Sequence, residues 1–124
     1  MEPRIDDEYL IDLLTDLVNI HSVFPEEKNI MLLLEEELKR IGLPPKRIPV
    51  TKERWNLLSR IGSGSPIFCL NAHTDTVPPS GKSLPTARVV DDVMYGLGAA
   101  DDKSSVAAMV AAVKAVAEAG GPPS

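Results

Sequence analysis

The stretch "IFCLNAHTDTVPP", Ile67 to Pro79, decides both the fold and the candidate site. Ile67 to Leu70 is apolar on both faces, which is typical of a strand covered by helices. His73 then lies at the carboxyl end of the predicted strand, where open α/β sheets bind their ligands. Residues two apart in an extended segment point to the same side, so Asp75 can approach the ring of His73. The stretch therefore predicts a buried strand with a ligand site at its end.

Two amphipathic helices are predicted before this strand. Leucines and valines at helical spacing indicate a first helix from about Asp6 to Ile20, with acidic caps at its start. A second apolar stripe runs from Ile30 to Ile41, and Pro25 is expected in the first turn of that helix. Gly42, just beyond the last turn, is the expected stop. Both helices have the apolar face that a sheet needs as cover.

Short apolar runs and one Ala-rich helix make up the rest of the chain. Three features are expected to be β structure: strands at Ile48–Val50 and Leu57–Ile61, and a hairpin of Val89–Val90 with Val93–Tyr95 around Asp91-Asp92. The segment "GSGSP" joins the second of these strands to Ile67–Leu70 as a turn. The Ala-rich helix follows Lys103. This order of elements predicts an α/β fold with a helix-flanked mixed, partly parallel sheet.

Composition narrows the class of protein. The chain has 124 residues, 44% hydrophobic and 25% charged, as in a soluble globular domain. A net charge of -5 argues against a nucleic-acid surface, and no apolar run approaches the roughly 20 residues of a membrane span. We expect no signal peptide at the acidic N-terminus. The single cysteine, Cys69, is expected in the core, and a cytoplasmic location follows from the lack of a second cysteine.

The pair His73 and Asp75 allows two interpretations. A metal-bound imidazole usually donates its other N–H to an acceptor such as a carboxylate, so the spacing fits a ligand and the group that orients it. Alternatively, a histidine at a strand end is bonded to a nearby aspartate for structural reasons alone. The other histidine, His21, continues the apolar stripe of the first helix and is expected to pack rather than to bind metal.

A second acidic site lies in "GLGAADDKSS", Gly96 to Ser105. Its start resembles a dinucleotide-binding loop, but Asp101 and Asp102 would repel a pyrophosphate, so we reject nucleotide binding there. A glycine turn after a strand can instead hold a carboxylate at the mouth of a sheet, where it binds one or two divalent ions. The alternative is that either aspartate caps the following helix. Lys103, at the start of that helix, is expected in solvent.

Together, "HTDTVPP" and "YGLGAADDKSS" resemble the zinc-dependent amidohydrolase and metallopeptidase family of acetylornithine deacetylase, succinyl-diaminopimelate desuccinylase, carboxypeptidase G, aminoacylase and the dinuclear-zinc dipeptidases. In that family an H-x-D motif ends a core strand and a G-x-G-x-x-D-x-K motif opens a helix. The similarity covers essentially the whole chain. It implies the N-terminal part of a phosphorylase/hydrolase-like zinc peptidase catalytic domain.

The resemblance also implies roles for individual residues. His73 matches a ligand of one zinc, and Asp75 matches the catalytic carboxylate that orients it. Asp101 matches the carboxylate that bridges two Zn²⁺ ions, for which Co²⁺ or Mn²⁺ can substitute. The Asp101–Asp102 bond matches a position that is cis in the family, and Asp102 is expected to support the metal ligands without binding an ion itself. The implied reaction is attack of a metal-activated bridging water on an N-acyl amino acid or a small peptide.

The sequence departs from the family pattern at single positions, which include Ser104 and Ser105 where glycine is common, and in its extent. Leu97 stands where many members carry arginine, which removes no ligand. The glutamate pair, the further acidic ligand, the last histidine and the lid or dimerisation domain do not lie within residues 1–124. We therefore expect this chain to be the N-terminal part of a catalytic domain whose full-length form is a homodimer. With so few ligands the isolated chain should hold zinc weakly and hydrolyse little.

An alternative stays open on the sequence. The chain could be a non-catalytic truncated α/β module that binds a partner chain or a single weakly held ion. The coding sequence after Ser124 would separate the two hypotheses, because a glutamate pair and a distant histidine there favour the enzyme.

Overall fold

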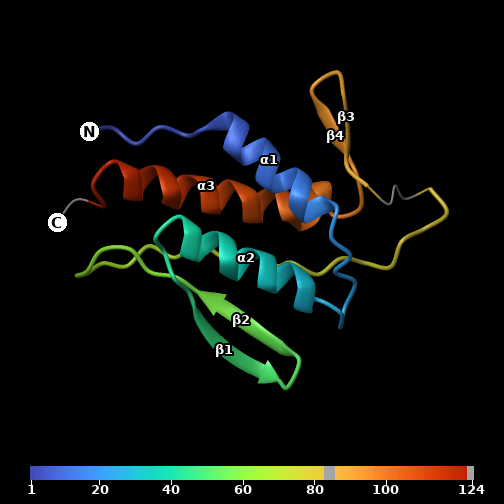
Figure 1. Cartoon of the computed structure of the whole chain (residues 1–124), viewed down its shortest axis with the longest axis horizontal. Helices are drawn as coiled ribbons and strands as arrows, with labels where there is room; N and C mark the ends of the chain where they lie inside the picture. The colour runs from blue at the N-terminus through green and yellow to red at the C-terminus, as the bar shows by residue number, and fades with distance from the viewer. Residues whose placement is uncertain (83–85, 123–124) are drawn as a thin grey trace.

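In the computed structural model, which describes residues 1–82 and 86–122, helix α1 spans Asp7–Val18 (Figure 1). The Oδ1 atom of Asp6 accepts a hydrogen bond from the backbone N–H of Tyr9 at 3.0 Å, so the predicted acidic cap is confirmed. The helix ends two residues earlier than predicted, with Asn19 as its C-cap. Its buried face carries leucines and a valine toward the other helices.

Helix α2 spans Lys28–Arg40. Gly42 follows it with a φ angle of 81°, the left-handed conformation that commonly ends a helix, as predicted. The prediction that Pro25 lies in the first turn of this helix is wrong. Pro25 lies instead in a tight turn, closed by a hydrogen bond from the Glu26 N–H to the Val23 carbonyl at 2.6 Å, and the helix starts only after that turn.

The third helix, α3, spans Ser104–Glu118 and is the predicted Ala-rich helix. An irregular helical turn, η1 (Ala99–Lys103), leads into it. Helix α1 packs against α3 and η1, and α2 packs against β2 (Arg54–Leu58). The three helices share one aliphatic core, made of Leu13, Leu17, Ile30, Leu34, Val106, Ala107 and Val110. This core fixes the start of α3, and with it the acidic motif, relative to the end of α1.

The described strands form two separate antiparallel pairs (Figure 1). Strand β1 (Lys46–Thr51) pairs with β2, and β3 (Arg88–Val90) pairs with β4 (Val93–Tyr95). The second pair is the predicted hairpin. Asp91 and Asp92 form its turn with φ angles of 49° and 63°, which match a two-residue turn of the kind that suits hairpins.

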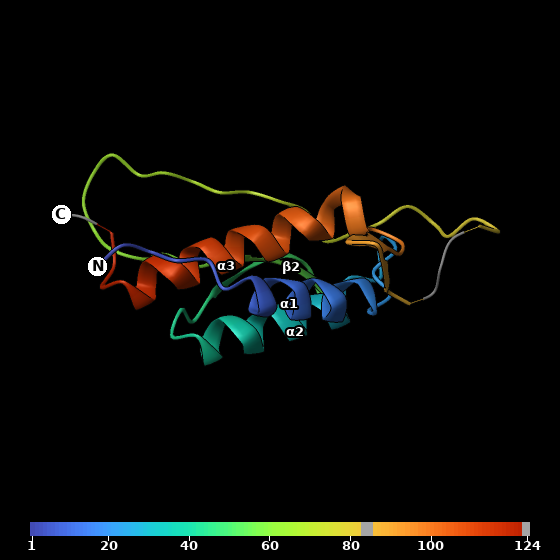
Figure 2. The same ribbon diagram turned by 90° about the horizontal axis from the view of Figure 1, so that it is seen from above.

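The prediction of a buried strand at Ile67–Leu70 is wrong for this chain. The segment is extended but belongs to no strand, and Phe68 is 87% exposed. Figure 2 shows the connection after β2 running to the end of the molecule where the termini lie and returning as an extended chain. A strand needs hydrogen-bond partners at its edge, and within residues 1–82 and 86–122 the only parallel bridge is the isolated pair Val23 and Thr76. The coarse α/β class holds, while the partly parallel sheet does not form here.

Two further predictions about burial are also wrong. Cys69 is exposed with the rest of the extended segment, because no layer covers it. His21 is also exposed, and its Nε2 lies 2.7 Å from the Glu26 carboxylate rather than in the core. No helix in the described ranges has both the length and the apolar character that crossing a membrane requires.

Candidate metal centre

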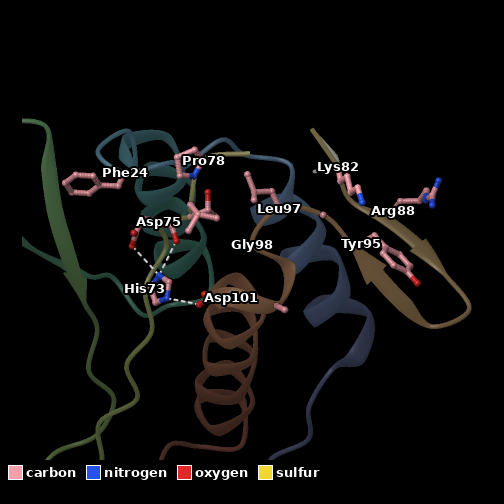
Figure 3. Close-up of a pocket in the computed structure, with 14 residues that line it drawn as sticks. Phe24, His73, Asp75, Pro78, Lys82, Arg88, Tyr95, Leu97, Gly98 and Asp101 are labelled. Carbon is pink, nitrogen blue, oxygen red and sulfur yellow. Dashed lines mark hydrogen bonds and ion pairs between the residues drawn. The ribbon is translucent and has the colours of Figure 1, made fainter. Parts of the chain in front are cut away.

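The extended segment and η1, the turn that leads into α3, bring His73 and Asp101 together. The imidazole Nε2 of His73 lies 3.0 Å from Oδ1 of Asp101, although the two residues are 28 positions apart (Figure 3). His73 and Asp101 therefore lie close together, as the sequence predicted, even though the apolar run Ile67–Leu70 is not a strand. Both side chains line one cavity of about 830 Å³.

Asp75 lies on the other side of the ring. The Nδ1 atom of His73 is 3.1 Å from the Asp75 carbonyl oxygen and 3.2 Å from its Oδ1 (Figure 3). Both oxygens only accept, so Nδ1 carries a hydrogen and donates it. The extended backbone from His73 to Asp75 places the two side chains on one side, as predicted. Asp75 thus fixes the orientation of the ring.

This tautomer has a consequence for Nε2. When Nδ1 carries the hydrogen, a neutral ring presents the lone pair of Nε2 to the Asp101 carboxylate, and two acceptors face each other at 3.0 Å. A cation between them removes that repulsion, either as a proton on the ring or as a metal ion. Two ligands of one tetrahedral zinc ion lie about 3.4 Å apart, from bonds of about 2.1 Å. The observed separation differs from this by a few tenths of an ångström, so His73 and Asp101 fit a shared ion.

The pKa of His73 reflects the same surroundings. Partial desolvation pulls this pKa down, but the hydrogen bonds to Asp101 and Asp75 and their negative charges outweigh it, so the pKa is raised above the usual value for histidine. The site attracts positive charge. A bound metal ion would take the place of that proton.

Asp102 also belongs to this cluster. The backbone N–H of His73 donates to its Oδ2 at 3.3 Å, which ties the extended segment to the start of α3. The pKa of Asp102 is lowered, chiefly by a hydrogen bond with Ser105 and also by the His73 backbone N–H. The Asp101–Asp102 peptide bond is cis, as the family resemblance implies. Asp102 acts as a support for His73, and the cap residue of α3 is Lys103, which makes no side-chain capping bond.

Lys103 is the residue whose role the sequence analysis missed. It was expected in solvent, but only 1% of it is exposed. Its Nζ donates to the carbonyl oxygen of Ile20 at 2.7 Å, near the end of α1, where helix carbonyls lack partners. Burial lowers the pKa of Lys103 to about 8. The G-x-G-x-x-D-x-K pattern, which includes this lysine, was the signal in the sequence that Lys103 has a structural role. In the structure Lys103 links the acidic turn to the end of α1.

The glycines of the same motif are required by close packing. Gly98 has a φ angle of 80°, and a Cβ atom there would lie 2.6 Å from Cγ2 of Thr76. A Cβ atom on Gly96 would collide with Cγ1 of Val18. The glycines therefore let the turn that carries Asp101 lie directly against α1 and the extended segment.

The arrangement is open and incomplete as a metal site. The His73 and Asp101 side chains are 51% and 86% exposed. In the part of the chain that the structure describes, no group of three or more His, Cys, Asp or Glu side chains could hold an ion. Zinc in proteins normally has at least three protein ligands. His73 and Asp101 could therefore supply only part of the coordination sphere of a metal ion.

Comparison with known proteins agrees with this geometry. Residues 69–124 match the model of Peptidase family M20/M25/M40. These residues therefore resemble a Peptidase family M20/M25/M40 domain. The matched range contains all four residues of the cluster, His73, Asp75, Asp101 and Asp102. The family resemblance drawn from the two motifs is confirmed.

Several curated proteins are similar to this chain over most of its length. The succinyl-diaminopimelate desuccinylase of Bordetella pertussis is 39% identical over 115 residues, covering 85% of this chain and 29% of that protein. The enzyme of the same name from Rhodospirillum centenum is 35% identical over 122 residues, covering 91% and 32%. The one from Pseudoalteromonas atlantica is 39% identical over 111 residues, covering 86% and 29%. The chain thus spans about three tenths of the length of these relatives.

Proposed function

We propose that this chain supplies part of the metal centre of a hydrolase that cleaves the amide bond of N-acyl amino acids or small peptides. In this proposal His73 is a ligand of one of two zinc ions, Asp101 bridges both, and Asp75 holds the imidazole. The observation that carries the proposal is the 3.0 Å approach of Nε2 of His73 to Oδ1 of Asp101 inside a cavity of about 830 Å³. Cavities of this size suit small-molecule substrates.

Each residue of the cluster has a defined task. Zinc, when bound, acidifies a water molecule and polarises the amide carbonyl. His73 offers Nε2 to the ion because its Nδ1–H is engaged by Asp75. Asp101 brings negative charge to the same point, and Asp102 holds the backbone of His73. The three carboxylates thus set the position, the orientation and the tautomer of one imidazole.

The remaining parts of the site are proposed to come from outside this chain. The missing zinc ligands and the general base would lie in the portion of the relatives that this chain does not match. That portion would also pair with the exposed segment at Ile67–Leu70 and complete the partly parallel sheet. The names of the relatives make N-succinyl amino acids the first substrates to test. A homodimer and a cytoplasmic location are part of the same proposal.

Zinc titration of the chain tests the metal site directly. The chain has only two histidines, so their ring protons can be assigned in a proton NMR spectrum with single substitutions. We expect zinc to shift the ring signals of His73 and to leave those of His21 unchanged. Asp101→Asn should weaken zinc binding, because it removes the carboxylate that shares the ion. Asp12→Asn, on the exposed face of α1, is the matched control.

One result would contradict the proposed site, and another would contradict the expectation of weak binding. Zinc that shifts the two histidines equally would mean that no site exists at His73. Two zinc ions retained after dialysis would contradict the expectation of weak binding that rests on the ligand count. Release of free amine from N-succinyl and N-acetyl amino acids should be measured on the same samples, with little turnover expected from this chain alone.

A further inference from the structure

One buried serine outside both motifs contacts the segment that carries His73. Ser22 lies shortly after α1, and only 1% of it is exposed. Its hydroxyl group donates a hydrogen bond to the carbonyl oxygen of Thr74 at 2.7 Å. Its own carbonyl oxygen accepts a hydrogen bond from the backbone N–H of Thr76 at 3.0 Å. Ser22 therefore binds the extended segment on both sides of Asp75.

These two hydrogen bonds hold both peptide groups of Asp75. The first acts on the peptide group between Thr74 and Asp75, and the second acts on the peptide group that follows Asp75. A trans peptide group is planar, so its N–H and C=O bonds point in opposite directions. The Thr76 N–H points to Ser22, so the carbonyl of Asp75 points away from Ser22. Nδ1 of His73 lies 3.1 Å from that carbonyl oxygen, so Ser22 aims the group that accepts the Nδ1–H (Figure 3).

The short segment after α1 also contacts the acidic motif. Two residues before Ser22, the carbonyl oxygen of Ile20 accepts a hydrogen bond from the Nζ of the buried Lys103 at 2.7 Å. Helix α1, which leads into this segment, packs against α3 and η1. Ser22 thus holds the histidine motif, and Ile20 holds the acidic motif, from one segment whose position is set by the helical core.

We propose that Ser22 is a positioning residue of the metal centre, which holds Asp75 so that His73 presents its Nε2 atom to the ion. The inference rests on the proposed function, because it concerns how the proposed zinc ligand is oriented. Ser22 lies outside residues 69–124, the range that matches the family model. The part of the chain before that range would therefore arrange the metal site without supplying a ligand.

Ser22→Ala tests this inference, with Ser59→Ala as the matched control. The hydroxyl group of Ser59 also donates to a backbone carbonyl oxygen, that of Leu43 at 2.8 Å, but Ser59 does not line the cavity at His73. We expect Ser22→Ala to raise the zinc dissociation constant at His73 about tenfold in the NMR titration, which is the lower end of the effect of changing a residue that supports a metal ligand. Ser59→Ala should leave that constant unchanged, although each variant loses one hydrogen bond.

The tautomer of His73 gives a second measurement that needs no zinc. The ¹⁵N chemical shifts of the two ring nitrogens show which one carries the hydrogen when the ring is neutral. We expect the Nδ1–H form to dominate in the wild-type chain and in Ser59→Ala, and the Nε2–H form to gain population in Ser22→Ala. A loss of stability alone would not change this ratio in the folded chain. Ser22→Cys fills nearly the same space with only a weak donor, so it should change the tautomer in the same direction and replaces Ser22→Ala if that variant does not fold.

The outcomes separate this inference from the proposed function. If zinc binds at His73 and Ser22→Ala matches Ser59→Ala in either measurement, the inference is overturned and the proposed function stands. If zinc leaves the His73 signals of the wild-type chain unchanged, the proposed function is overturned, and the tautomer alone decides the inference. In that case a tautomer that changes in Ser22→Ala supports the positioning role, and an unchanged tautomer refutes it.

Discussion

Substitution of Gly98 tests whether close packing holds the acidic turn in place. In Gly98→Ala the new Cβ would lie 2.6 Å from Cγ2 of Thr76 and 3.2 Å from Cδ of Lys103. The φ angle of 80° adds the cost of a left-handed residue, about 1–2 kcal/mol. Overpacking adds about 1–3 kcal/mol. We therefore expect the free energy of unfolding to fall by about 2–5 kcal/mol in total.

Gly42 provides a matched control for the backbone cost. Its φ angle is 81°, and a Cβ atom there would meet no described atom within 4 Å. Gly42→Ala should therefore cost only the backbone share, about 1–2 kcal/mol. Urea unfolding of the three chains, followed by the circular dichroism of the helices, gives each free energy by linear extrapolation. The difference between the two variants measures the steric share at Gly98.

A second-site change identifies the contact responsible. Thr76→Ser removes the Cγ2 methyl group that the new Cβ would strike, so Gly98→Ala combined with Thr76→Ser should recover part of the lost stability. Residues in contact show such coupling, whereas distant residues add independently. If Gly98→Ala costs no more than Gly42→Ala, or if Thr76→Ser brings no recovery, the packing argument for this motif is wrong.

Three other predictions follow from the site and the core. Asp75→Asn should lower the zinc affinity of the chain about 10- to 100-fold in NMR titration, because the carboxylate that orients the ligating imidazole is lost. Leu17→Ala should cost about 2–5 kcal/mol in urea unfolding, since Leu17 is completely buried, whereas Leu32→Ala, at an exposed position of α2, should cost far less. The pKa of Glu37 is lowered, chiefly by its hydrogen bond with Arg40. The wild-type chain should therefore be more stable than Glu37→Gln at pH 7, and this advantage should shrink as the pH falls below about 4.5. Unfolding measured at several pH values checks this.

The sequence predicted the elements that depend on local chemistry. The helices follow from their apolar spacing, from the Asp6 cap and from the left-handed Gly42, all of which act within a few residues. The hairpin follows from the two residues of its turn, Asp91 and Asp92. The spacing of His73 and Asp75 likewise fixed their shared side, because it depends only on an extended backbone.

Burial and pairing could not be predicted in the same way. The apolar run Ile67–Leu70 has the composition of a buried strand, but burial depends on which other segments are present to cover it. The same composition fits a strand inside a sheet and an extended segment without a neighbouring strand. The prediction for Lys103 was wrong in the opposite direction, because this residue was expected in solvent and is buried. A lysine at a helix start is usually exposed, and the sequence does not show that the carbonyl oxygen of Ile20 lies beside its Nζ.

The acidic motif and the histidine motif depend on each other in a way that neither shows alone. His73 is held by Asp75 from its own segment and by Asp101 and Asp102 from the start of α3. The extended segment needs no strand partner to reach this position, because its hydrogen bonds to the start of α3 and to the region after α1 hold it there. The proposed metal site is therefore arranged by the helices and does not depend on a strand at Ile67–Leu70.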